Sequence, residues 1–130
     1  MTTVQRVVQI VSILLIIVGV AGMIPGIGTM DMQPVMLFGL IPVNVLENIV
    51  HIALGAWGLM ASRSYAGSKN YAMINGGLYI VLAVLGFVDP SGFGLMPLGG
   101  NALIVHALFG IILLAVAFTA KPTTGAPAVA

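Results

Sequence analysis

The residues that could carry chemistry in this chain are one glutamate and two histidines set in strongly apolar sequence. Glu47 and His51 lie four residues apart in the second apolar segment, so on a helix they share one face and can pair along it. His106 lies in the fourth apolar segment, at a comparable depth from the end of its helix. Imidazoles on two helices can act as axial ligands of a cofactor, and ionisable groups inside a membrane can relay protons.

These residues belong to polar stripes on the expected helices. At 100° per residue, the polar side chains of the second segment fall on one stripe, and those of the third segment do the same. In lipid such side chains turn toward protein, because hydrocarbon offers them no partner. We therefore expect the stripes to meet inside a helical bundle, although Asn101 does not share a face with His106. The candidate site consists of Asn44, Glu47, Asn48, His51, Asn75, Tyr79, Asn101 and His106.

The composition is that of an integral membrane protein. Of the 130 residues, 60% are hydrophobic and 5% are charged, whereas soluble domains carry roughly 25% charged residues. The net charge of +1 leaves no basic face for nucleic acid, so we expect no nucleic-acid partner. The absence of cysteine excludes disulfides and Cys-ligated metals.

The apolar segments predict an all-α fold, a bundle of four transmembrane helices in a single domain over residues 1–122. The expected helices cover about residues 5–24, 43–63, 70–89 and 100–120, followed by a flexible tail at 123–130. Pro42 suits the start of the second helix. The apolar stretch 35–41 is too short to span, so we expect it at the interface or folded back on the bundle. A polar turn is expected at about 63–70.

The charged residues sort by side in this topology. The basic residues fall on one side, and they are Arg6, Arg63, Lys69 and Lys121. The acidic residues fall on the other, and they are Asp31, Glu47 and Asp89. The positive-inside rule then predicts that both termini are cytoplasmic.

The second and fourth segments carry a common pattern. Pro42-x8-His51-x3-Gly55 recurs as Pro97-x8-His106-x3-Gly110, at an offset of 55 residues. Helix, outer loop and Pro-started helix form the repeated unit. The pattern predicts two repeated helical hairpins related by an axis along the membrane normal.

The same residues carry a resemblance to a known family. The motifs are Asn44-x2-Glu47-Asn48-x2-His51-x3-Gly55, Gly76-Gly77-x-Tyr79 and Asn101-x4-His106. With these motifs, from the first helix to the fourth, the chain resembles an uncharacterised bacterial family of small four-helix membrane proteins, the domain of unknown function 4383. The resemblance implies a four-helix fold in a bacterial inner membrane. It implies no activity and adds no site residue.

The first function hypothesis is a structural one. Asn, Glu and His would hold the helices together by hydrogen bonds, in a small accessory protein that binds other membrane proteins or itself. On this interpretation we expect no resident cofactor and no metal. No nucleophile–base pair or phosphate loop is present, so we also expect no enzyme.

Two alternatives use the polar site directly. In the first, His51 and His106 ligate a haem or a chlorophyll-type pigment, with Glu47 as acceptor to His51; the close packing of helices at 8–10 Å opposes this. In the second, Glu47 and His51 serve a small transporter or proton relay with Asn75 and Tyr79.

Overall fold

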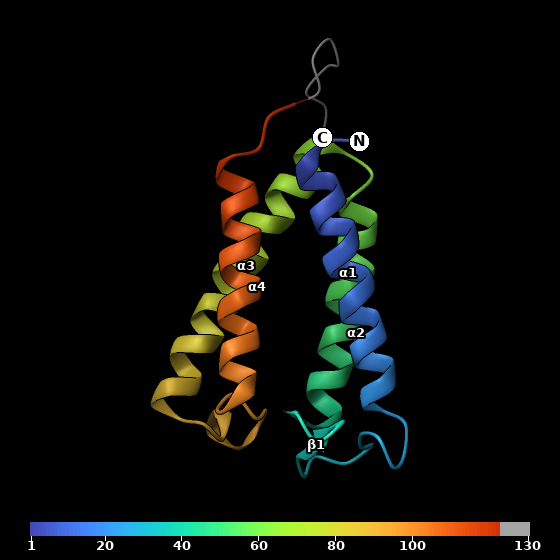
Figure 1. Cartoon of the computed structure of the whole chain (residues 1–130), viewed down its shortest axis with the longest axis vertical. Helices are drawn as coiled ribbons and strands as arrows, with labels where there is room; N and C mark the ends of the chain where they lie inside the picture. Colours follow the sequence, from blue (N-terminus) through green and yellow to red (C-terminus); the bar gives the residue numbers. More distant parts are fainter. Residues whose placement is uncertain (123–130) are drawn as a thin grey trace.

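The computed structural model describes residues 1–122, and the tail predicted at 123–130 lies outside this range. The described chain contains four α-helices, which confirms the predicted fold class (Figure 1). They are α1 (Thr3–Gly22), α2 (Val45–Ala61), α3 (Tyr65–Val88) and α4 (Asn101–Phe118). Three of them, α1, α3 and α4, are long and apolar enough to cross a membrane, whereas α2 is apolar but shorter. Such helices are typical of a membrane protein.

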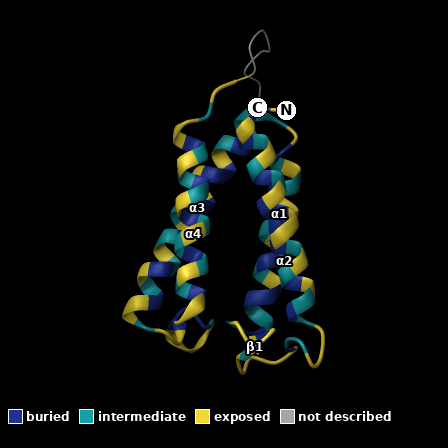
Figure 2. Ribbon diagram, viewed as in Figure 1, coloured by how far each residue is buried: buried dark blue, intermediate teal, exposed yellow. Residues whose placement is uncertain are grey.

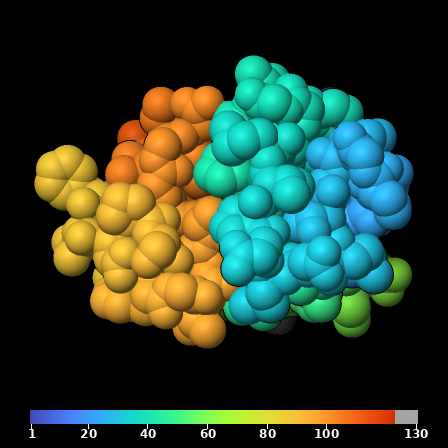
Figure 3. Space-filling view, turned by 90° about the horizontal axis from the view of Figure 1, so that it is seen from below, coloured from blue at the N-terminus to red at the C-terminus, as the bar shows by residue number. Residues whose placement is uncertain are grey.

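The helices are arranged as two antiparallel pairs. α1 packs mainly against α2, and α3 packs mainly against α4, while smaller contacts of α1 with α3 and α4 join the pairs. Figure 1 shows both described chain ends at one end of the molecule and the long loops at the other. Seen from the loop end in Figure 3, the first loop (teal and blue) adjoins the second (yellow and orange).

Side-chain caps set the start of three helices. The Thr2 hydroxyl and the Gln5 side chain form a reciprocal capping box at α1. The Asn44 side chain accepts a hydrogen bond from the Glu47 amide at 2.9 Å and so begins α2. The Ser64 hydroxyl accepts one from the Gly67 amide at 3.0 Å. This cap starts α3 at residue 65, five residues earlier than predicted, so the polar turn between α2 and α3 is shorter than expected.

The loop before α2 contains a two-stranded hairpin that the sequence did not predict. Strands β1 (Val35–Leu37) and β2 (Ile41–Val43) pair antiparallel, with Met36 opposite Pro42. The chain reverses through Gly39, whose φ of +70° suits glycine. The start expected for the second helix at residue 43 is therefore corrected to residue 45, because Pro42 and Val43 belong to β2.

Glycines bring the two helices of each pair into close contact. A Cβ atom on Gly55 of α2 would lie 2.7 Å from the Ser12 carbonyl oxygen of α1. A Cβ atom on Gly110 of α4 would lie 3.1 Å from the Gly76 carbonyl oxygen of α3. The absence of a side chain at both positions is what allows backbone to approach backbone.

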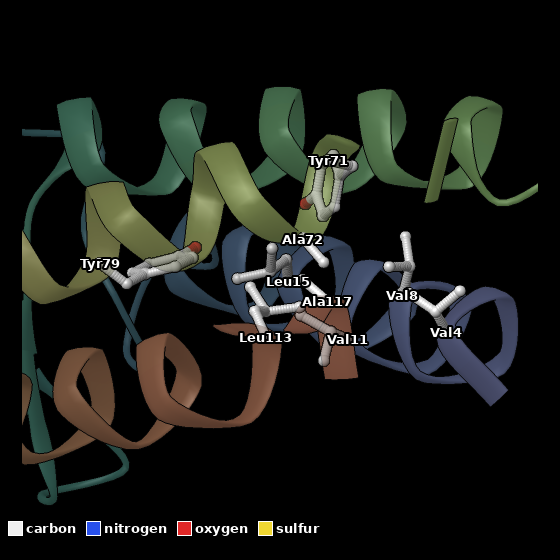
Figure 4. Packing of buried hydrophobic residues seen from close by; sticks show 9 residues of the cluster. All are labelled: Val4, Val8, Val11, Leu15, Tyr71, Ala72, Tyr79, Leu113 and Ala117. Carbon is white, nitrogen blue, oxygen red and sulfur yellow. The ribbon is translucent and has the colours of Figure 1, made fainter. Parts of the chain in front are cut away.

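Burial follows the pattern expected for lipid-facing helices. The pairs meet in an apolar cluster shown in Figure 4, which consists of Val4, Val8, Val11, Leu15, Tyr71, Ala72, Tyr79, Leu113 and Ala117. Polar side chains such as Ser12, Ser68 and Asn75 are buried, while large aliphatic side chains such as Ile17 and Ile111 are exposed (Figure 2). An apolar exterior around a partly polar interior suits a hydrocarbon environment.

Candidate functional site

A glutamate and two histidines meet where the two helix pairs face each other. The Nε2 atom of His51 lies 3.8 Å from Oε1 of Glu47, and the Nε2 atom of His106 lies 3.5 Å from the same oxygen. Glu47 and His51 are one turn apart on α2, and His106 comes from α4. Glu47 and His106 are each only 3% exposed. The structure thus joins side chains of different pairs around one carboxylate.

The cluster has the composition and spacing of a metal-ligand set. Each of the three residues offers one ligand atom, and these atoms all lie within 4.8 Å of one another. The cluster also carries unused bonding capacity. Among the described residues, Oε2 of Glu47 and the Nδ1 atoms of His51 and His106 are buried without a hydrogen-bond partner. Buried polar atoms are normally satisfied, so these atoms have bonding capacity for an ion, a water molecule or a ligand.

A cavity of about 250 Å³ adjoins the cluster. Helices α1, α2 and α4 and strand β2 contribute its walls, which consist of Leu14, Leu15, Val18, Ile41, Val43, Glu47, His51, Ala102, Val105, His106, Leu108 and Phe109. Apart from the glutamate and the histidines, these lining side chains are apolar. The cluster therefore forms the polar end of an otherwise apolar chamber.

Aromatic rings from the second pair support His106. The Tyr79 ring stacks on the His106 imidazole, with ring centroids 5.6 Å apart and an interplanar angle of 29°. The Phe109 ring packs edge-on against Tyr79 at 5.9 Å. These contacts restrict the orientation of the imidazole, while the buried Tyr79 hydroxyl has no partner among the described residues.

The predicted asparagines mostly serve the framework around the cluster. The Asn48 amide group donates to the carbonyl oxygens of Gly22 at 2.8 Å and Thr29 at 3.2 Å. These bonds tie α2 to the end of α1 and to the loop that follows. Asn75 donates to the Tyr71 carbonyl oxygen of its own helix at 3.1 Å and does not join the cluster.

Asn44 and Asn101 link the two long loops reciprocally. The Asn44 amide group, at the start of α2, donates to the Leu95 carbonyl oxygen at 2.7 Å. The Asn101 amide group, at the start of α4, donates to the Leu40 carbonyl oxygen at 2.6 Å. Asn101 is exposed, in line with the expectation that it does not share the face of His106. Both bonds hold the loop ends of the pairs together near the cluster.

Sequence reasoning missed the apolar part of the site. Phe109 and Val105 line the cavity beside His106, yet they are ordinary residues of an apolar helix. Val105 directly precedes the histidine and Phe109 follows it by one turn, and such spacings are too common in an apolar helix to have identified them. The loop carbonyls of Leu40 and Leu95 gave no signal, because every residue has one.

Comparisons with known proteins give a family and no activity. A family model described as "Domain of unknown function (DUF4383)" matches residues 5–119, which is most of the chain. No curated protein and no solved structure matches the chain.

Proposed function

We propose a function from the geometry of the site, because the chain belongs to the DUF4383 family, whose description assigns none. The protein is a membrane protein that binds one divalent first-row transition-metal ion through Glu47, His51 and His106. The observation that carries the proposal is the meeting of these three buried ligands from two helix pairs, all within 4.8 Å of one another.

The spacing of the ligand atoms suits such an ion. Three atoms spaced roughly 3.5 Å apart surround a point about 2 Å from each, which is the Zn–N distance in proteins. The contacts of 3.5 and 3.8 Å around Glu47 are at or just above this spacing, so small side-chain rotations complete the set. Two imidazoles and a carboxylate bind zinc or ferrous iron and leave at least one coordination position open.

The unpaired atoms favour an ion over hydrogen bonding alone. If the three side chains served only to hold the helices together, Oε2 of Glu47 would be buried without compensation. Leaving a buried acceptor unsatisfied costs roughly 1–3 kcal/mol. A divalent cation can satisfy that carboxylate, because both of its oxygens are then available to the ion.

The same geometry favours a single ion over a haem or pigment. Both Nε2 atoms lie close to one oxygen of Glu47, at 3.8 and 3.5 Å, so the carboxylate occupies space beside the imidazoles that a haem ring would need. The cavity of about 250 Å³ also falls below the usual 300–1,000 Å³ of sites for larger ligands.

The placement in the membrane follows from the charges. The basic residues Arg6, Arg63 and Lys121 belong to the end that carries the termini, whereas Asp31 and Asp89 belong to the long loops. The positive-inside rule supports cytoplasmic termini in a bacterial inner membrane. The metal site then lies in the outer half of the bilayer, because Glu47 is in the first turn of α2.

Two introduced cysteines test this orientation, since the chain has none of its own. Ser91→Cys lies in the exposed second loop, and Thr119→Cys lies at the exposed end of α4. In right-side-out membrane vesicles, a membrane-impermeant maleimide is expected to label Cys at 91 directly and Cys at 119 only after lysis. The reverse pattern would place the termini outside.

An internal duplication accounts for the way the pairs are built. Gly55 and Gly110 are 55 residues apart, and the carbonyls they approach, on Ser12 and Gly76, are 64 residues apart. Gly22 and Gly86, near the ends of α1 and α3, are also 64 residues apart. Equivalent contacts at constant offsets support two copies of one helical hairpin. The duplication gives each hairpin a histidine at the shared interface.

Metal content is the direct test of the proposed function. We expect about one transition-metal ion per chain in protein purified in mild detergent, and tight rebinding of Zn²⁺ after chelation. We expect a loss of Zn²⁺ affinity of about 100-fold or more in each of the variants Glu47→Gln, His51→Ala and His106→Ala. Even residues that only hydrogen-bond to metal ligands contribute 10–100-fold to metal affinity.

Asp89→Asn is the matched control, because it removes an acid that lies outside the cluster. The Ser91 hydroxyl donates to the exposed Asp89 carboxylate at 2.6 Å and holds the pKa of Asp89 below its usual value. This carboxylate is therefore ionised at neutral pH, yet its loss should leave Zn²⁺ affinity unchanged. Wild-type protein with helices intact by circular dichroism but no Zn²⁺ affinity above that of the three variants would refute the proposal.

A further inference from the structure

The cavity beside the cluster extends to the surface that faces lipid. Its lining includes Leu14 of α1 and Leu108 of α4, which are 43% and 53% exposed. Both belong to helices that are long and apolar enough to span a membrane. A chamber bounded by these two side chains is accessible to molecules dissolved in the bilayer, between α1 and α4.

The chamber has one polar end and apolar walls. Among the described residues that line it, Glu47, His51 and His106 carry the polar atoms, and Val18, Val105 and similar side chains form the rest. Ligand sites have this character when a few polar groups fix one end of a mainly apolar molecule. The occupant should therefore have a small polar head and an apolar body.

The chemistry of the head follows from the acceptors at the polar end. Glu47 lines the cavity, and its carboxyl group accepts hydrogen bonds. The apolar walls offer no cation to a carboxylate or phosphate, and burying an unpaired charge is costly, so an anionic head is unfavourable. A neutral hydroxyl group donates to the carboxylate without introducing charge.

The volume limits the size of the head. About 250 Å³ holds roughly eight groups of water or methylene size, taking about 30 Å³ for each. This is enough for one six-membered ring with its hydroxyl groups. A longer tail must leave through the opening at Leu14 and Leu108.

We propose that this cavity binds a lipid-soluble quinol, with its ring hydroxyl at Glu47, His51 and His106 and its tail extending between α1 and α4 into the bilayer. The binding site goes beyond the metal ion and does not require it. In metal-free protein the hydroxyl donates to the Glu47 carboxyl group, and if the three side chains held an ion, the hydroxyl oxygen would be available as a further ligand.

A substituted benzoquinol with a ten-carbon tail is the probe, and its dimethyl ether is the matched ligand. The ether has the same tail and ring but cannot donate a hydrogen bond. Binding to detergent-purified full-length protein is measured under argon, for example by the shift in melting temperature with probe concentration. We expect saturable binding of the quinol and at least 10-fold weaker binding of the ether.

Two variants on neighbouring residues of α4 separate cavity binding from partition into detergent. Val105→Phe fills the cavity beside His106, whereas Ile104→Phe adds the same ring at a side chain that is 62% exposed and does not line the cavity. We expect Val105→Phe to weaken quinol binding by at least 10-fold and Ile104→Phe to leave it unchanged. Equal binding by both variants, or by quinol and ether, would overturn the proposal.

Zn²⁺ affinity measured on each preparation keeps the two proposals apart. Val105→Phe retains Glu47, His51 and His106, so its Zn²⁺ binding should match wild type. Protein that binds the quinol but no metal would refute only the metal site. Protein that binds Zn²⁺ but shows no difference between quinol and ether would refute only the quinol site.

Discussion

Replacing Asn48 by alanine is expected to lower the free energy of unfolding by about 3 kcal/mol, from roughly 1–3 kcal/mol for one buried carbonyl group left without a donor plus the lost hydrogen bond to a second carbonyl. The Asn48 side chain is fully buried and donates to the carbonyl oxygens of Gly22 and Thr29. The Gly22 carbonyl also accepts from the Thr29 amide at 2.6 Å, whereas among the described residues the Thr29 carbonyl accepts from Asn48 alone.

The environment of Asn48 leaves it little freedom to be replaced by another side chain. Gly22 packs directly against the Asn48 carboxamide, so any side chain at position 22 would displace it. Glu47 precedes Asn48 on the same helix and faces the histidines of the candidate metal site. Loss of Asn48 therefore loosens the end of α2 that carries this glutamate, and Zn²⁺ affinity should fall with stability.

Unfolding in mixed micelles with increasing sodium dodecyl sulfate, followed by circular dichroism, measures the effect. Asn75→Ala is the buried control, because Asn75 is also fully buried but bonds only to the Tyr71 carbonyl of its own helix, which the helix already satisfies. Asn101→Ala is the exposed control. Both should cost about 1 kcal/mol, the net value of one hydrogen bond. An Asn48→Ala variant no less stable than these two would contradict the assignment.

The sequence could predict the helices and the inward-facing residues because both follow from the solvent. A polar side chain in an apolar helix has no partner in lipid, so Glu47, Asn48 and His51 had to face protein. All three are buried in the structure. The repeat predicted that His51 and His106 lie at the same depth in the membrane. Equal depth does not determine which side chain contacts both histidines.

The relative position of the two helix pairs was not predictable from the polar stripes. One oxygen of Glu47 lies within 3.8 Å of both histidines. This contact depends on how α2 and α4 are rotated about their axes. The loop bonds from Asn44 and Asn101 that join the pairs end on main-chain carbonyls, which any sequence provides. The cavity likewise depends on the distance between α1 and α4, for which the spacing of apolar residues gives no measure.

The short elements and one helix boundary were not predicted correctly, for a different reason. The apolar run at 35–41 is compatible with a strand, an interfacial turn or a buried segment, and its length does not discriminate among them. The strand that pairs with β1 contains Pro42, and a proline by itself favours the start of a helix. The beginning of α3 was placed too late because Ser68 and Lys69 look like loop residues, although Ser64 caps the helix before them.

Gly55→Val is expected to lower the free energy of unfolding by about 3 kcal/mol, the upper part of the usual cost of overpacking. A Cβ atom at position 55 would approach the Ser12 carbonyl oxygen of α1 to 2.7 Å, and a backbone atom cannot rotate away as a side chain can. The helices α1 and α2 must separate to admit the new side chain. Separation would also shift His51, one turn earlier on the same face of α2.

Valine substitutions at two other glycines, with less crowded Cβ positions, provide the comparison for this prediction. Gly110→Val should cost less, about 2 kcal/mol, because its nearest neighbours are the movable end of Ile80 and a carbonyl at 3.1 Å. Gly77→Val is the control, since no atom of the described residues lies within 4 Å of its Cβ position and valine is a somewhat better helix former than glycine. Unfolding in sodium dodecyl sulfate should therefore rank Gly55→Val as least stable, then Gly110→Val, with Gly77→Val close to wild type. Equal stability of all three variants would mean that close backbone contact does not hold the helix pairs together.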